Sequence, residues 1–214
     1  MSHNAITTLR TPGNVSPSIF DKGVLRGSIG LAIISLVGCG LLYPLAGVGL
    51  GQALFPSTAN GSLIERDGKV LGSSLVAQPF SDDRYFQSRP SAANYDVMAV
   101  AGSNQARTNP DLRKRVDETR AALAQRYGVE PSAIPSDLVT QSGGGIDPHI
   151  SSQAAAIQID RVAHARGVSR DVIEALVSQH TEGKQLGLLG QPRVNVLELN
   201  LALDAVAKMP VAKQ

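Results

Sequence analysis

Residues 27–55 read GSIGLAIISLVGCGLLYPLAGVGLGQALF, and none of these side chains is charged. The run without Asp, Glu, Lys or Arg continues to Ile64. A helix needs about 20 apolar residues to cross a bilayer, whereas the apolar core of a secretory signal is usually about 7–15 residues long. We therefore predict an uncleaved transmembrane helix over residues 27–50.

The tetrapeptide Leu36–Cys39 offers an alternative, because it resembles a lipoprotein box and follows the basic residues Lys22 and Arg26. Cleavage there would leave Cys39 as a lipidated N-terminus. Lipoproteins normally turn polar after that cysteine, whereas this chain continues with leucines, so the uncleaved helix is favoured. Cys39 is the only cysteine in the sequence, which excludes an intrachain disulfide.

The charges beside the apolar run predict its orientation. Three basic residues and one acidic residue precede it, whereas Glu65, Arg66 and Asp67 follow it. The positive-inside rule then predicts a cytoplasmic tail over 1–26, the transmembrane helix over 27–50, a linker over 51–62 and an extracytoplasmic domain over 63–214.

Two glycine pairs in and beside the apolar run have the spacing that lets membrane helices approach closely. They are Gly23 with Gly27 and Gly47 with Gly51. We name these four glycines as candidate contacts with a partner helix.

The outer domain is electrically balanced, because 17 basic and 17 acidic residues follow residue 64. Nucleic-acid-binding proteins need basic surfaces, and tryptophan, a common base-stacking residue, is absent. The composition therefore argues against nucleic acid as a partner.

The periodicity of the outer domain predicts an α+β fold that is rich in helix toward the C-terminus. Asp67-Gly68 separates two β-type runs and indicates a hairpin. Helix starts, stops and apolar stripes predict four helices: Pro110 to Tyr127, Ser152 to Arg166, one capped by Ser169, and one from Asn195 to Lys208.

Residues 81–96 read SDDRYFQSRPSAANYD and are typical of a loop. One interpretation is an ordered surface loop whose two aromatic residues point inward. The other is a contact loop for another protein, since Arg and Tyr are enriched at interfaces. The candidate contact residues are Arg84, Tyr85, Phe86 and Arg89.

The stretch Ser142–Ser151, SGGGIDPHIS, combines glycines with Asp147 and His149. It lacks the Gly-Lys-Ser/Thr of a phosphate loop. Asp147 and His149 could in principle converge with His180 and Glu182 on a metal, but the spacing matches no zinc motif. A simpler interpretation is a tight turn at Asp147-Pro148, followed by serines that cap a helix.

Four segments in order resemble one known family: YFQSRPSAANYD, PSDLVTQSGGGIDPHIS, QIDRVAHARGVS and QHTEGKQLGLLGQPRVNVLELNLALD. They are similar to the C subunit of the bacterial Kdp potassium-transporting ATPase, which also has one membrane helix and one outer domain. The family often has Ser-Gly-Ser-Gly-Leu-Asp where this chain has Ser142 to Asp147. Some members have Asn in place of His149, which weakens a ligand role for this histidine.

The resemblance implies a non-catalytic subunit of an inner-membrane potassium pump. Its implied partners are a potassium-binding channel-like subunit, a P-type ATPase subunit and a small membrane subunit. It would have no cofactor of its own, would be needed for assembly, and would raise the affinity of the ATPase subunit for ATP. Asp147 and His149 would then be partner contacts, and Gln153 and Gln158 are the residues we name for an effect on nucleotide.

An extracytoplasmic domain cannot touch ATP in the cytoplasm, so an effect on ATP affinity would have to be transmitted through the assembly as a coupling free energy. The alternative hypothesis is a membrane-tethered metal- or nucleotide-binding enzyme that works alone. It would use Asp147, His149 and His180.

Overall fold

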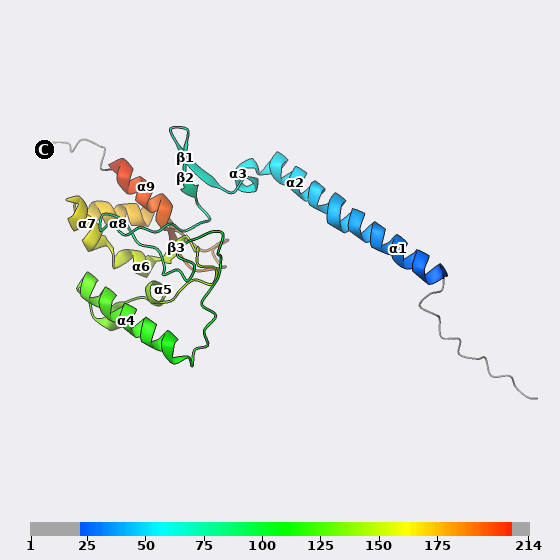
Figure 1. The fold of residues 1–214 in the computed structure, drawn as a ribbon. Coiled ribbons are helices and arrows are strands. Elements are labelled where there is room, and N and C mark those ends of the chain that lie inside the picture. Colours follow the sequence, from blue (N-terminus) through cyan, green and yellow to red (C-terminus); the bar gives the residue numbers. More distant parts are fainter. Residues whose placement is uncertain (1–21, 207–214) are drawn as a thin grey trace, which may run out of the picture. The chain divides into compact units, whose positions relative to one another are not determined.

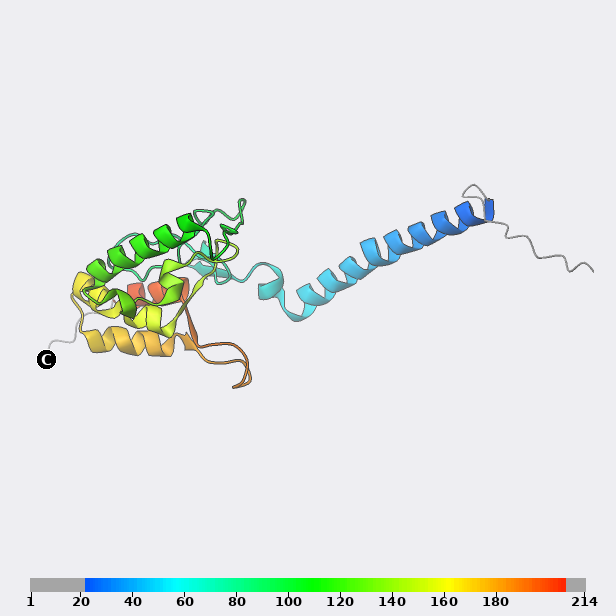
Figure 2. The ribbon, with the colours of Figure 1, turned by 90° about the horizontal axis from the view of Figure 1, so that it is seen from below.

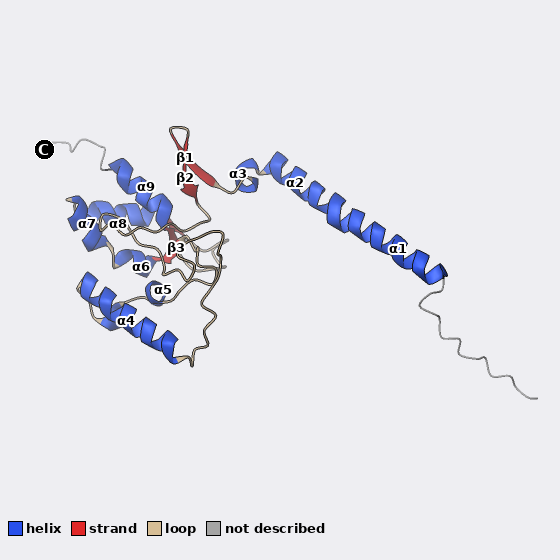
Figure 3. Ribbon diagram, viewed as in Figure 1, coloured by secondary structure: helices blue, strands red, loops and turns tan. Residues whose placement is uncertain are grey.

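A computed structural model describes residues 22–206. The chain divides into two units, Met1–Ala59 and Asn60–Gln214. The described part of the first unit is helical, whereas the second unit mixes helices with short strands (Figures 1 and 3). The predicted combination of one apolar N-terminal helix and a helix-rich α+β unit is confirmed.

The first unit contains α1 (Lys22–Val37), the π-helical turn η1 (Gly38–Leu42) and α2 (Tyr43–Leu54). Together they include a 32-residue helix, Gly23–Leu54, whose most apolar 18-residue window has a mean hydropathy of 2.1 and is wholly unburied. At about 1.5 Å per residue it exceeds the roughly 30 Å hydrocarbon core. The helix is longer than predicted at both ends.

The linker prediction over residues 51–62 was therefore partly wrong. Residues 51–54 complete α2, and Pro56–Ala59 form the short helix α3. Leu54 and Phe55 are apolar, so nothing in the sequence stops the helix at residue 50, and Pro56 lies where a proline is tolerated, at the first position of a new helix.

The π-turn in the apolar helix has a local cause. The backbone N–H of Tyr43 donates to the carbonyl of Gly38, five residues back, and Pro44 follows at once. Proline has no N–H to donate and its ring crowds the preceding turn. The wider turn keeps the chain helical across this position, as such turns do elsewhere.

The second unit opens with an antiparallel hairpin of β1 (Leu63–Arg66) and β2 (Lys69–Ser73). Asp67 and Gly68 both have positive φ, 53° and 72°, the geometry that a two-residue hairpin turn requires. The hairpin predicted at Asp67-Gly68 is confirmed.

The remaining elements follow in chain order. The helices are α4 (Pro110–Tyr127), η2 (Pro131–Ala133), α5 (Ser136–Val139), α6 (Ser152–Ala156), α7 (Ile159–Arg166), α8 (Arg170–Gln179) and α9 (Val196–Val206). Strands β3 (His149–Ser151), β4 (Thr181–Glu182) and β5 (Arg193–Asn195) form an antiparallel sheet in the order β3-β5-β4. Asn109 caps α4 through the N–H of Asp111, and Gly128 ends it with a φ of 66°, as predicted.

The core lies between the small sheet and the helices. Ile150 of β3 pairs with Val194 of β5, and both are buried. Helices α7, α8 and α9 add the buried residues Val162, Ile173, Leu199 and Leu203. The leucines that alternate through residues 197–203 belong to a helix, as predicted, although a strand would give the same alternation.

Residues 152–166 form two helices, and the prediction of a single helix was wrong. The break lies at Ile157–Gln158, between α6 and α7. The backbone N–H of Gln158 donates to the carbonyl of Ala155, three residues back. In a regular α-helix this N–H would donate to the carbonyl of Ala154, which therefore loses its backbone donor. The Gln158 side chain replaces that donor at 3.0 Å.

The segment 83–87, which begins in a turn and lies outside any strand, is held by side chains. Each of its five carbonyl oxygens accepts a hydrogen bond from a side chain. Arg161 and Arg166 of α7 donate to the first three of these carbonyls, those of residues 83–85. Exposed carbonyls could bond to water, but buried ones need such partners.

Two buried side-chain amides hold the last two residues of this segment. Asn200 accepts from the N–H of Phe86 at 2.8 Å and donates to its carbonyl at 3.0 Å. Gln158 makes the same pair with Gln87, at 2.8 and 3.2 Å. Phe86, Gln158 and Asn200 are at most 1% exposed. We call Gln158 and Asn200 the amide clamp.

Replacing Gln158 with methionine should destabilise the second unit strongly. The backbone N–H of Gln87 would lose its partner, and each buried unsatisfied group costs about 1–3 kcal/mol, so we expect a loss of about 2–4 kcal/mol. Chemical unfolding of the purified chain in detergent measures this. Gln153→Met is the matched control, because Gln153 is exposed on the preceding helix and should change stability by less than about 0.5 kcal/mol. Equal losses would contradict the clamp.

Candidate functional site

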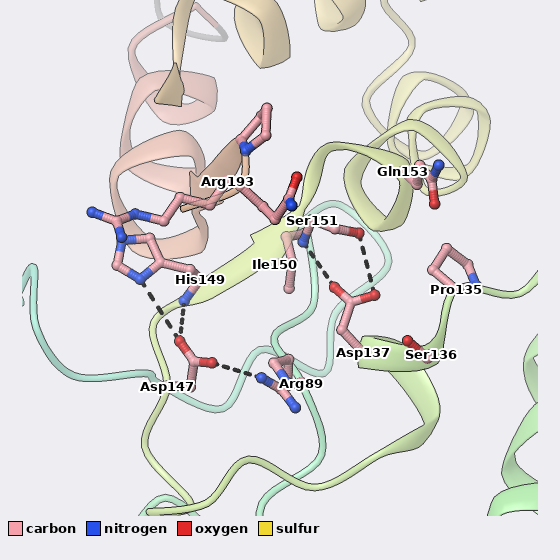
Figure 4. Close-up of a pocket in the computed structure, with 12 residues that line it drawn as sticks. Arg89, Pro135, Ser136, Asp137, Asp147, His149, Ile150, Ser151, Gln153 and Arg193 are labelled. Carbon is pink, nitrogen blue, oxygen red and sulfur yellow. Dashed lines mark hydrogen bonds and ion pairs between the residues drawn. The ribbon is translucent and has the colours of Figure 1, made fainter. Parts of the chain in front are cut away.

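A cleft of about 470 Å³ lies beside strand β3 of the second unit (Figure 4). Side chains alternate between the two faces of β3. Ile150 is therefore buried in the core, whereas His149 and Ser151 point outward and line the cleft. The lining residues are Arg89, Pro135, Ser136, Asp137, Asp147, His149, Ile150, Ser151, Gln153, Gln191, Pro192 and Arg193. The cleft therefore unites three of the four segments that carry the family resemblance.

Asp147 is the centre of the charged cluster in this cleft. It accepts from the backbone N–H of His149 at 3.0 Å and from Arg89 Nη1 at 2.8 Å, and the His149 ring nitrogen Nδ1 lies 3.7 Å away (Figure 4). Partial burial acts to raise the pKa of Asp147, but these contacts with His149 and Arg89 outweigh burial and lower the pKa to about 2. Asp147 is therefore ionised at neutral pH and fixes the turn.

Arg89 joins this turn to the loop of residues 81–96. The hydroxyl of Tyr95 donates to the Arg89 carbonyl at 2.8 Å, and the guanidinium reaches Asp147. Arg89 Nε is buried without a hydrogen-bond partner in the part of the chain described. A guanidinium held in this way presents fixed donors to an incoming acceptor.

Asp137 fixes the other side of the cleft. Its carboxylate accepts from the backbone N–H of Ser151 at 2.8 Å and from the Ser151 hydroxyl at 3.2 Å. The same hydroxyl oxygen accepts from the N–H of Ala154 at 3.0 Å, which caps α6 as the sequence predicted. The expected turn and helix start are thus present, but His149–Ser151 is a strand that the prediction missed.

Of the three glycines in SGGGIDPHIS, Gly145 carries the strongest conformational demand. Its φ is 75°, and a Cβ there would lie 2.9 Å from the carbonyl oxygen of Ala101. A Cβ at Gly144 would make only ordinary contacts, and one at Gly143 would meet nothing within 4 Å. A serine at position 144 therefore fits this backbone.

The candidate contact residues of the 81–96 loop lie in different surroundings. Phe86 is fully buried, so it belongs to the core and its nomination as a surface contact was wrong. Tyr85 donates to Asp204 at 3.1 Å and lies under the Arg166 guanidinium, 4.8 Å from the ring centre. Arg84 is exposed and paired with Asp82. The interpretation with both aromatics turned inward describes the loop better.

The two glutamines named for an effect on nucleotide also differ. Gln153 is exposed at the rim of the cleft (Figure 4). Gln158 is fully buried, and its amide is engaged by Gln87, Ala154 and Arg161. A partner molecule could therefore reach Gln153, whereas Gln158 is committed to the fold.

The histidine and carboxylate candidates for a metal are spread over separate contacts. His180 Nδ1 lies 2.9 Å from the carbonyl of Leu176 at the end of α8, and Glu182 pairs with Arg193 at 2.8 Å. Within residues 22–206, no group of three or more His, Cys, Asp or Glu side chains could hold a metal ion. The arrangement gives no support to the tethered-enzyme alternative.

Two of the four candidate glycines of the apolar helix, Gly27 and Gly47, face open space within the described chain. A Cβ at Gly27 or Gly47 would meet nothing within 4 Å, and one at Gly51 would lie 3.7 Å from Ala59. Their contact with a partner helix stays a prediction, as it does for Gly23. Cys39 is a free, exposed cysteine in the π-turn.

Comparison with known proteins decides the family. The family model described as KdpC, K+-transporting ATPase, c chain, matches residues 25–205. The chain belongs to the KdpC family. It is 58% identical over 184 residues to the potassium-transporting ATPase KdpC subunit of Xanthomonas oryzae pv. oryzae, covering 86% of this chain and 88% of that protein. It is also 47% identical to the subunit of Dechloromonas aromatica, over 87% of this chain and all of that protein.

Membership of the KdpC family confirms the resemblance drawn from the four sequence segments. It makes the chain a subunit of a potassium-transporting ATPase complex and implies association with a membrane, consistent with the apolar helix Gly23–Leu54. Sequence reasoning missed Asp137 and Arg193 as cleft residues. Asp137 lies within the second segment of the resemblance and Arg193 within the fourth, so the segments themselves were the available signal.

Replacing Asp147 with asparagine should lower stability at neutral pH by about 1–2 kcal/mol, after allowance for the partial exposure of this side chain. Because the folded pKa of about 2 lies below the ordinary 3.8, this contribution is complete above pH 4 and disappears as the pH falls toward 2. Unfolding of the parent chain and Asp147→Asn across that range measures it. A difference that does not shrink in acid would contradict an ionised Asp147 as the source.

Proposed function

We propose that the chain is an accessory, non-catalytic subunit of the potassium pump, needed for assembly and acting as a catalytic chaperone. In this role it anchors in the inner membrane by one helix and raises the affinity of the ATPase subunit for ATP. The observation that carries the proposal is that, within residues 22–206, one helix is apolar and long enough to cross a membrane and is followed by a separate folded unit, in a chain of the KdpC family. The sequence has no Asp-Lys-Thr-Gly-Thr segment for phosphoryl transfer.

The proposed partners are the potassium-binding channel-like subunit, the P-type ATPase subunit and a small membrane subunit. The glycine pairs of the helix would contact membrane helices of these partners, because glycines at this spacing let helices approach closely and a Cβ at Gly27 or Gly47 would meet nothing within 4 Å. The cleft at Arg89, Asp147 and His149 would contact the channel-like subunit, because its fixed donors and acceptors suit a protein surface. ATP with magnesium would belong to the ATPase subunit.

The proposed orientation puts the N-terminal tail in the cytoplasm and the second unit outside. The basic residues Arg10, Lys22 and Arg26 on the N-terminal side of the span support it. An outer domain cannot touch cytoplasmic ATP. The effect on ATP affinity would therefore pass through the helix and the assembled subunits, each stabilising one conformation of the pump.

Cysteine labelling tests the orientation, because Cys39 is the only cysteine. In a Cys39→Ser background, Ser132→Cys places a thiol at an exposed position of η2. We expect a membrane-impermeant maleimide to label it in intact spheroplasts. Ser16→Cys in the N-terminal tail should react only after the membrane is opened. The reverse pattern would place the second unit in the cytoplasm and allow direct contact with nucleotide.

A truncated chain ending at Ala59 tests the accessory role. If the second unit acts as proposed, complexes purified with this truncation should assemble poorly or need more ATP for half-maximal potassium-stimulated activity. Gln153→Ala in the full chain is the control for direct contact, and it should leave the ATP dependence unchanged because an outer residue cannot reach the nucleotide. Normal recovery and normal ATP dependence of the truncated complex would contradict the proposal.

A further inference from the structure

The loop between β4 and β5 exposes leucines to an unusual degree. Leu186, Leu188 and Leu189 are 90%, 82% and 61% exposed. They lie on a turn closed by paired backbone hydrogen bonds between Gln185 and Leu189, each 2.9 Å long. Monomeric soluble domains seldom present such clusters without an apolar partner. We call residues 185–189 the leucine turn.

The backbone of the leucine turn keeps these side chains outward. Leu186 and Gly187 both have positive φ, 53° and 73°. A positive φ is unfavourable for a leucine. A residue keeps such a conformation when other interactions stabilise it, and here the two backbone hydrogen bonds between Gln185 and Leu189 close the turn. The turn is therefore shaped to project three apolar side chains together.

The charges around the turn suit a lipid surface. Residues 183–192 contain one basic residue, Lys184, and no acidic residue. A lysine beside apolar side chains can keep its ammonium group at the headgroups while its neighbours enter the acyl region. An acidic residue at this place would be repelled by anionic lipid.

A second exposed apolar segment lies at the same end of the second unit. Val97, Met98 and Val100 are 53%, 90% and 52% exposed. Figures 1 and 2 place this segment and the loop after β4 at the end where β1 begins, away from the last turn of α9. Asn195 of β5 also donates to the carbonyl of Ser74, just after β2, at 2.7 Å, which ties the root of the leucine turn to the entry hairpin.

The segment between the apolar helix and β1 is short, which limits the distance between them. Eight residues, 55–62, separate the apolar helix from β1. Fully extended, they would reach at most about 28 Å, and the helix α3 shortens this reach. The start of β1 can therefore lie no farther than this from the end of the apolar helix.

We propose that the leucine turn inserts into the surface of the bilayer that carries the chain's own membrane helix, with Lys184 at the headgroups. Insertion removes the exposed leucines from water and gives the second unit a second attachment beside its tether. The proposal holds on whichever side of the membrane the second unit lies. Its failure would therefore leave the proposed orientation and pump function untouched.

A tryptophan reporter tests this insertion, because the chain contains no tryptophan. The full chain with Leu188→Trp is reconstituted into vesicles of phosphatidylcholine and phosphatidylglycerol, either plain or brominated at a shallow acyl position. We expect bromine to remove most of the indole emission and aqueous iodide to have little effect. Val172→Trp is the control, because Val172 lies in the first turn of α8, at the end of that helix farther from β4, and it should respond only to iodide.

The same measurements in the assembled pump separate lipid from protein contact. Insertion predicts quenching by bromolipid both in the chain alone and in the complex. Protection from both quenchers in the complex would place the turn against a partner subunit and overturn the proposal. Strong iodide quenching in both samples would overturn it as well. Circular dichroism and unfolding of each variant establish that the tryptophan leaves the fold intact.

Discussion

The second unit depends on hydrogen bonds that side chains supply to a stretch of backbone outside any strand. Residues 83–87 run beside the helices without a strand partner, yet each carbonyl accepts from Arg161, Arg166, Gln158 or Asn200. The amide clamp also satisfies the N–H groups of Phe86 and Gln87. Buried peptide groups left unpaired would oppose folding strongly, so these four side chains let Phe86 enter the core between α7 and α9.

The hydrogen bonds that fix residues 83–87 also position the cleft. Once Gln87 is fixed, Arg89 lies two residues farther along and meets Asp147 at 2.8 Å. Asp147 holds the turn into β3, and Asp137 holds the end of β3 and the start of α6. Loop, turn and strand are therefore positioned together, and their charges neutralise one another. Such an arrangement presents a rigid polar surface, which suits the accessory role proposed for a KdpC family member.

Local patterns predicted the parts of the fold whose causes are local. The uncharged run predicted the apolar helix, Asp67-Gly68 the hairpin, and Asn109 with Gly128 the ends of α4. Strand β3 escaped prediction because its partner β5 lies more than forty residues away. The break between α6 and α7 depends on a long-range contact of Gln158 with Gln87. Arg89, Asp147 and His149 were named separately as candidate partner contacts, and the structure brings them into one cleft, which their distance in the sequence could not indicate. Phe86 was named as a contact but lies in the core, because aromatic residues are common both in cores and at interfaces.

Hydrogen–deuterium exchange of the purified chain measures the central claim most directly. The backbone amides of Phe86 and Gln87 lie in a segment without strand partners, and the amide clamp is what protects them. The account predicts that both exchange as slowly as the amides in the middle of α9, because they open only when the second unit unfolds. Exchange as fast as in the exposed segment around Met98 would contradict it, since the clamp would then not hold the backbone in solution.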